Sequence, residues 1–272
     1  MYEKLIAFIG RYFLYSLLFS LPFLAIFFSD IMTKKATFTF WIASFIPQVL
    51  TFLCLCYKYR LFGNLRKCLI TSFTFNSKMF ILIMTFSFGI PISVILINNE
   101  IIKSIDINFN VNLYYLKNLP IIFLLTFLSA FIEELIFRFI PYELLPKDVK
   151  YKSLFIINSI FCSAHLFNPN FSVIGLFSVL FAGVLLTIIY IKTSNILYST
   201  LVHTFWNFII GPILGGNVSG ITTGGVFSYK TLKSDFLSGG NYGMEGSIIS
   251  LIILLVFIIL WKKNLLTMTK YP

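Results

Sequence analysis

Long apolar segments separated by short polar ones repeat along the whole chain of 272 residues. Each segment is close to the roughly 20 residues that a helix needs to cross a hydrocarbon core. Strands of a membrane barrel would instead alternate apolar and polar residues over about 10 positions. The pattern therefore predicts eight helices, at residues 5–28, 37–57, 79–97, 119–140, 153–168, 173–191, 194–214 and 247–261.

Composition indicates that lipid is the main solvent of this chain. Hydrophobic residues make up 58% of it and charged residues 11%, whereas about 25% of residues are charged in soluble domains. We therefore expect an all-α fold, a polytopic transmembrane helix bundle of about eight helices that forms a single integral membrane domain over residues 1–272. The first helix has no small-residue cleavage site after Phe28-Ser29-Asp30, so we expect it to be retained rather than removed as a signal peptide.

The net charge of +11 is explained by orientation in a membrane. The basic residues lie in short clusters between apolar segments and not on one face, so we expect the lipid bilayer as a partner and no nucleic acid. With eight helices and a cytoplasmic N-terminus, fourteen Lys and Arg residues fall in inside segments and six in outside ones. This bias predicts a multi-pass plasma-membrane protein with its N- and C-termini in the cytoplasm.

Ten of the fifteen glycines lie between Gly211 and Gly246, in a polar segment that this topology places outside. Long loops serve either as solvated connections or as lids and substrate gates. The sequence favours a solvated connection here and leaves a lid or gate open as the alternative.

Two glutamates lie inside an apolar helix, which is a costly position for ionised carboxylates and one that marks functional interiors. Arg138 follows Glu134 by four residues, so the two share a helix face and can form an ion pair. Glu133 is rotated about 100° from that face and is left free to act as a general base. The alternative is that all three charges only lock helices together.

The two histidines of the chain, His165 and His203, both fall inside apolar helices. Asn207 follows His203 by four residues, so both side chains point the same way and can donate to one oxygen. Phe161 has the same relation to His165 and is expected to pack against its imidazole. The alternatives are histidines that are merely satisfied in the core and, for Asn207, an interhelical hydrogen bond.

The depths of Glu133, His165 and His203 in their helices permit one shared site, near the midplane or on its cytoplasmic side. Such a site suits hydrolysis in two ways. Glu133, His165 and His203 could hold a zinc ion that activates water. Alternatively, Glu133 with His165 deprotonates a water directly, and His203 with Asn207 stabilises the oxyanion. Asn207 favours the second way, because an amide is a better oxyanion donor than a zinc ligand, but both stay open.

Three motifs occur in order on three predicted helices: Glu133-Glu134-x-x-x-Arg138, Phe161-x-x-x-His165 and His203-x-x-x-Asn207. Together they resemble the CAAX protease and bacteriocin-processing family of intramembrane proteases, also called the Abi family. The resemblance covers about residues 119–214, which are thus the predicted catalytic core. It implies catalytic roles for Glu133, His165, His203 and Asn207, with Glu134, Arg138 and Phe161 in support.

The resemblance also implies hydrolysis of peptide bonds in a peptide or membrane-protein substrate. Members are described as metalloproteases, with a divalent metal such as zinc, or as glutamate-dependent enzymes. Bacterial members are linked to bacteriocin maturation, pheromone processing and self-immunity, and a composition rich in Phe, Ile, Lys and Asn favours a bacterial source. Two other functions stay open: a non-catalytic membrane immunity or scaffold protein, and a proton-coupled transporter that uses the same glutamates and histidines.

Overall fold

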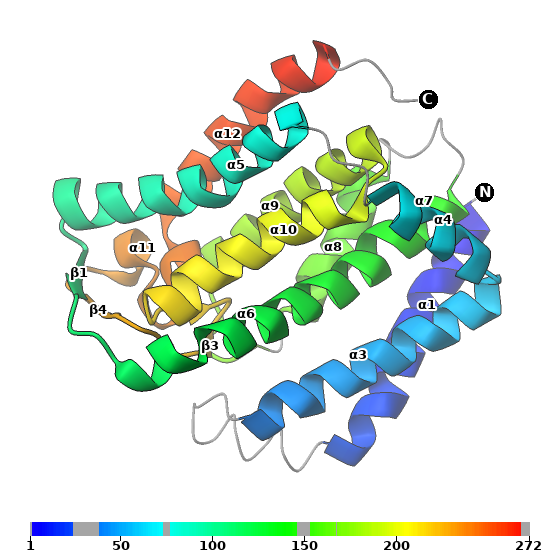
Figure 1. The fold of residues 1–272 in the computed structure, drawn as a ribbon, viewed down its shortest axis with the longest axis horizontal. Coiled ribbons are helices and arrows are strands. Elements are labelled where there is room, and N and C mark those ends of the chain that lie inside the picture. The colour runs from blue at the N-terminus through cyan, green and yellow to red at the C-terminus, as the bar shows by residue number, and fades with distance from the viewer. Residues whose placement is uncertain (1, 24–37, 73–76, 146–152, 167, 268–272) are drawn as a thin grey trace.

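The computed structural model describes residues 2–23, 38–72, 77–145, 153–166 and 168–267. It is an all-α bundle, as the apolar pattern predicts, and each of the eight predicted segments coincides with a helix (Figure 1). The end of the first segment, residues 24–28, lies outside the described residues. The eight helices are α1 (Tyr2–Ser20), α3 (Phe38–Tyr59), α5 (Ser77–Leu96), α6 (Leu113–Glu134), α8 (Leu154–Ala164), α9 (Val173–Thr193), α10 (Ile196–Phe208) and α12 (Ile248–Thr267).

Several helices continue through a turn of different pitch. A short 3₁₀ turn, η1 (Leu21–Phe23), extends α1. Wider π-helical turns extend three others: η2 (Ile97–Ile101) after α5, η3 (Leu135–Phe139) after α6, and η5 (Ile209–Ile213) after α10. Helix α7 (Ile140–Leu144) follows η3 without a break. The turn η3 begins directly after Glu134 and η5 begins two residues after Asn207, and π turns occur often at functional sites.

Two helices differ from the sequence-based prediction. Helix α8 ends at Ala164 rather than at residue 168, because the chain turns at His165 and Leu166. Helix α4 (Phe62–Ser72) lies where a basic inside loop was expected. Its Leu65, Cys68 and Leu69 pack against the core, and this spacing is that of an amphipathic helix too short to cross a membrane.

The glycine-rich segment is folded. Strands β2 (Asn217–Val218) and β3 (Ile221–Thr222) form an antiparallel hairpin. Strand β4 (Ser228–Thr231) pairs antiparallel with β1 (Ile105–Asn108), with Ile105 opposite Thr231. Three short helices follow, α11 (Asp235–Ser238), η6 (Gly240–Tyr242) and η7 (Met244–Gly246). The segment is therefore not the simple solvated connection that its composition favours.

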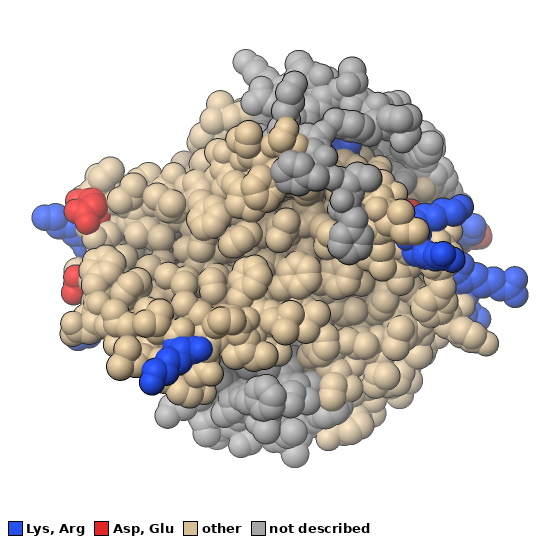
Figure 2. All heavy atoms as spheres, viewed as in Figure 1, with Lys and Arg blue, Asp and Glu red and all other residues tan. Residues whose placement is uncertain are grey.

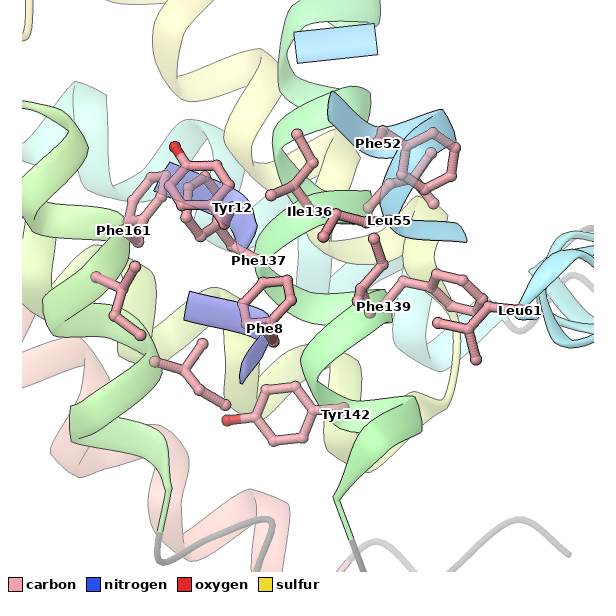
Figure 3. Packing of buried hydrophobic residues seen from close by; sticks show 14 of the residues in the cluster. Phe8, Tyr12, Phe52, Leu55, Leu61, Ile136, Phe137, Phe139, Tyr142 and Phe161 are labelled. Atoms are coloured by element: carbon pink, nitrogen blue, oxygen red, sulfur yellow. The ribbon is translucent and has the colours of Figure 1, made fainter. Parts of the chain in front are cut away.

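The helices pack around two apolar clusters. One joins α1, α3, α8 and the helical span from α6 to α7, and the other joins α5, α9, α10 and α12. In Figure 1, α10 runs beside α9 and between α5 and α6, and the short strands and α11 lie at one end of the bundle. Figure 3 shows Tyr12, Phe137 and Phe161 in the first cluster, where edge-to-face ring contacts of 5.0 and 5.2 Å link α1 to α8 through Phe137.

The surface matches a membrane environment. Among the described residues, four helical spans are long and apolar enough to cross a bilayer, namely Ile83–Ile101, Leu113–Leu144, Val173–Thr193 and Ile196–Ile213. Large apolar side chains such as Leu17, Ile92 and Ile259 are exposed. On the face shown in Figure 2, charged residues gather toward the two ends with a wide uncharged band between them. These features confirm the predicted all-α membrane fold.

Candidate active site

A cavity of about 640 Å³ opens inside the bundle. All four predicted catalytic residues line it: Glu133 from α6, His165 from the end of α8, and His203 and Asn207 from α10. Trp206, between the last two in sequence, also faces the cavity. The structure thus brings together residues that lie on three separate helices.

Glu134 is the centre of a buried charge network. Its Oε1 lies 3.1 Å from Nη1 of Arg138, and both side chains are fully buried, so the pair predicted from their spacing forms. The same oxygen lies 3.0 Å from Nδ1 of His203. Because a carboxylate accepts hydrogen bonds, His203 carries a proton on Nδ1 and donates it to Glu134. Glu134 therefore neutralises Arg138 and also orients the His203 ring.

Glu133 keeps its carboxylate in the cavity. Its Oε2 lies 3.8 Å from Nε2 of His203, beyond hydrogen-bond distance, and 21% of its side chain is exposed. Because Nδ1 of His203 bonds to Glu134, the other ring nitrogen, Nε2, faces Glu133. This arrangement leaves room for a ligand to reach both groups from the cavity.

Phe161 packs against three of the polar side chains at once. Its ring lies 4.4 Å below the Arg138 guanidinium carbon, 4.8 Å from the His165 ring and 6.2 Å from the His203 ring. Its carbonyl oxygen lies 2.9 Å from Nδ1 of His165. A carbonyl can only accept, so Nδ1 is the protonated nitrogen and Nε2 of a neutral His165 has a free lone pair.

Helix α9 closes the far side of the Arg138 network. Nη2 of Arg138 lies 3.4 Å from the Gly183 carbonyl and 3.5 Å from Oδ1 of Asn158. Asn158 in turn donates to Thr187 Oγ1 at 3.1 Å. A Cβ at Gly183 would lie 2.6 Å from Asn158 Oδ1 and 3.1 Å from a ring carbon of Phe161. A glycine is therefore needed here for the close approach of α8 and α9.

One predicted site residue, His165, is placed differently from its expected setting. His165 caps the end of α8 and is not inside a helix, which lets its ring turn into the cavity. The Asn207 amide makes no hydrogen bond to any other described residue. It is therefore available to a ligand in the cavity.

We examined whether Glu133, His165 and His203 fit a zinc site. A catalytic zinc ion needs three protein ligands within about 2 Å of one point. Within the described part of the chain, no group of three His, Cys, Asp or Glu side chains is placed to hold a metal ion. The arrangement of the described residues does not fit a three-ligand zinc site.

One acidic residue of the cavity was not singled out by the sequence analysis. Glu245, in the glycine-rich segment, is only 5% exposed and faces the cavity. Its carboxylate accepts hydrogen bonds from Nε1 of Trp206 and from the backbone and hydroxyl of Ser219. The sequence signal for Glu245 is its position directly before an apolar helix. The predicted topology placed this position in a solvated loop.

Comparison with known proteins supports a protease. Residues 115–209 match the family model described as Type II CAAX prenyl endopeptidase Rce1-like. No curated protein and no solved structure matches the chain. The matched region contains Glu133, His165, His203 and Asn207. Over residues 115–209 the chain is therefore similar to the CAAX-type endopeptidases, the family that the three motifs indicate.

Proposed function

We propose that this protein is an intramembrane endopeptidase that hydrolyses a peptide bond with Glu133, His165, His203 and Asn207. The observation that carries the proposal is that these four side chains, from three helices, line one cavity. The match to an endopeptidase family supports peptide-bond hydrolysis as the class of reaction. Residues 119–214 are the proposed catalytic core of a single membrane domain.

In the proposed reaction a water molecule binds between the Glu133 carboxylate and Nε2 of His165. Glu133 takes a proton from the water as the water oxygen attacks the carbonyl carbon of the peptide bond. The Asn207 amide and a protonated Nε2 of His203 donate hydrogen bonds to the resulting oxyanion. Collapse of this intermediate breaks the C–N bond, and the proton held by Glu133 passes to the leaving amine. The products are one new carboxyl terminus and one new amino terminus.

The cavity lining suits an apolar peptide or membrane-protein segment. Apolar side chains such as Leu185, Leu186 and Val202 form much of the lining, and its residues include no Lys or Arg. An apolar segment entering from lipid would replace water along these walls.

We further propose a bacterial plasma-membrane location with both termini in the cytoplasm, and a role in bacteriocin or pheromone processing or in self-immunity.

The test uses the full-length protein in the native host, with the membrane peptidome read by mass spectrometry. Wild type is compared with Glu133→Gln and His203→Ala at matched membrane levels. Because both variants remove a group that takes part in the reaction, we expect wild-type peptides or truncated proteins to disappear in both. Loss of a single catalytic group lowers rates by about 10²-fold or more.

A control variant and a second measurement complete the design. Glu100→Gln changes an exposed glutamate that takes no part in the cavity, and it should leave the peptidome as in wild type. A substrate found in this way is then cleaved in vitro with and without 1,10-phenanthroline, and the glutamate-activated route predicts no loss with the chelator. If both cavity variants complement the host fully and the peptidome is unchanged, the protein acts by binding alone and the catalytic assignment is wrong.

A further inference from the structure

The glycine-rich segment forms a wall of the cavity. Val218, Ser219, Ile221 and Thr223 of the β2–β3 hairpin line it together with Glu245. Trp206 and Asn207 of α10 line the same cavity. A substrate segment in the cavity would therefore contact the glycine-rich segment and the proposed oxyanion donor at the same time.

The hairpin turn is held in place by the chain that follows α8. Ser219 and Gly220 form its centre with φ of 48° and 85°, the positive values that a tight two-residue hairpin turn requires. A Cβ at Gly220 would collide with the Pro169 carbonyl oxygen. Nδ2 of Asn168 donates to the Ser219 carbonyl and Nδ2 of Asn170 to the Gly220 carbonyl, both at 2.9 Å. These contacts keep the turn in one conformation.

Glu245 fastens the same turn to α10. One carboxylate oxygen accepts from Nε1 of Trp206. The other accepts from the Ser219 backbone N–H at 2.6 Å and from its hydroxyl at 2.8 Å. The buried Glu245 side chain, which lies in η7 just before α12, thus bonds both to the hairpin and to the helix that carries His203 and Asn207.

Glu245 has no ion-pair partner among the described residues. Burial raises the pKa of the nearby Tyr242 well above its usual value, so that phenol stays neutral. A buried carboxylate without a cation is costly unless it is hydrogen bonded, and three donors supply those bonds here. A glutamine cannot replace it, because its NH₂ group would face a donor.

We propose that Glu245 is a positioning residue, which holds the glycine-rich segment as a fixed wall of the cavity and aligns the Trp206 indole beside Asn207. The substrate segment then binds against a preformed surface rather than under a moving gate. The peptide nature of the ligand rests on the proposed function. The fastening itself rests only on the contacts of Glu245.

The first experiment reads the Trp206 indole directly and needs no substrate. The chain has three tryptophans, so Trp41→Phe and Trp261→Phe leave Trp206 as the sole emitter. In this background Glu245→Gln should shift the emission and increase quenching by acrylamide, because the indole loses its acceptor. Glu100→Gln, an exposed glutamate outside the cavity, should change neither. Unchanged emission and quenching in Glu245→Gln would overturn the proposal.

The second experiment separates positioning from a general loss of structure. With a substrate found as above, Glu245→Gln should raise KM by roughly tenfold and change kcat by less, since the reacting groups stay in place. Glu245→Asp keeps the charge and should recover part of the effect. If Glu245→Gln does not fold, Ser219→Ala removes one of the three donors and should raise KM in the same direction by a smaller factor.

The outcomes distinguish the two proposals. A fall in kcat at unchanged KM, or a loss of thermal stability with both constants unchanged, contradicts positioning by Glu245. If wild type cleaves nothing, the proposed function fails, and the Trp206 emission still decides whether Glu245 fastens the wall.

Discussion

Two glutamates that are neighbours in sequence have different surroundings. Glu134 is fully buried and contacts Arg138 and His203. The Glu133 side chain is 21% exposed and faces the cavity. A helix rotates by about 100° per residue, so one carboxylate turns into the protein and the next into the cavity. The first can hold the imidazole, and the second is available for the proposed reaction.

Glu134→Gln should destabilise the protein and also slow cleavage. The change leaves the Arg138 charge buried without its carboxylate, which costs about 3–5 kcal/mol in comparable buried pairs. The His203 ring also loses the acceptor that fixes Nδ1, so its Nε2 is no longer aimed at the cavity. Stability is measured by denaturant unfolding in detergent, and cleavage by the peptide assay. Glu143→Gln, an exposed carboxylate on α7, is the matched control, and wild-type stability in Glu134→Gln would contradict the buried pair.

At the scale of elements, the contact between α8 and α9 supports the whole site. Gly183 of α9 lets Asn158 and Phe161 of α8 approach closely. Phe161 in turn contacts Arg138 and both histidines. A change in helix spacing here would therefore move all the polar groups around Phe161 together.

Gly183→Ala should reduce both stability and cleavage. The added methyl group would lie 2.6 Å from Asn158 Oδ1, and overpacking of this kind costs about 1–3 kcal/mol. The expected shift of Phe161 also displaces the imidazoles, so cleavage should fall even in the folded fraction. Activity and thermal unfolding are measured side by side.

Gly10→Ala on α1 is the matched control for this substitution. No atom lies within 4 Å of a Cβ at Gly10, and alanine favours a helix over glycine by up to about 1 kcal/mol. We expect this control to be neutral or slightly stabilising. If Gly183→Ala behaves in the same way, the close approach of α8 and α9 is not required.

At the scale of the whole molecule, charged side chains lie toward both ends of the bundle with an uncharged band between them (Figure 2). Figure 1 shows the start of α1 and the end of α12 at the same end, with α4 and α7, while β1, β4 and α11 lie at the opposite end. An excess of Lys and Arg on one side sets the orientation of membrane proteins. The end with α4 carries this excess in the sequence, so it is the proposed cytoplasmic end.

Cysteine labelling tests this orientation. In a chain whose four cysteines are replaced by serine, Lys230→Cys on β4 should react in intact cells with a maleimide that cannot cross membranes. Arg66→Cys on α4 should react only after the membrane is permeabilised. Both positions are exposed, so burial does not limit labelling. The reverse pattern would place the termini outside and contradict the proposed topology.

The sequence by itself determined the membrane class, the eight helices and the four catalytic candidates that the structure places in one cavity. Apolar segments long enough to cross lipid can satisfy their backbone only as helices or as closed barrels, so length and composition suffice for the class. The spacing from Glu134 to Arg138 and from His203 to Asn207 is also local, because residues four apart share a helix face. The family resemblance, which covers part of the chain, indicated the type of reaction.

Only the tertiary structure decided which partners these residues have. The bond from His203 to Glu134 joins positions 69 residues apart, and that from Trp206 to Glu245 joins positions 39 apart. Helix α4 and the wall formed by the glycine-rich segment were likewise not predicted. Periodicity reports which face of an element is apolar, but not which element covers that face. Which element covers a given face depends on the packing of the whole bundle. Here this packing places the glycine-rich segment in the lining of the candidate site.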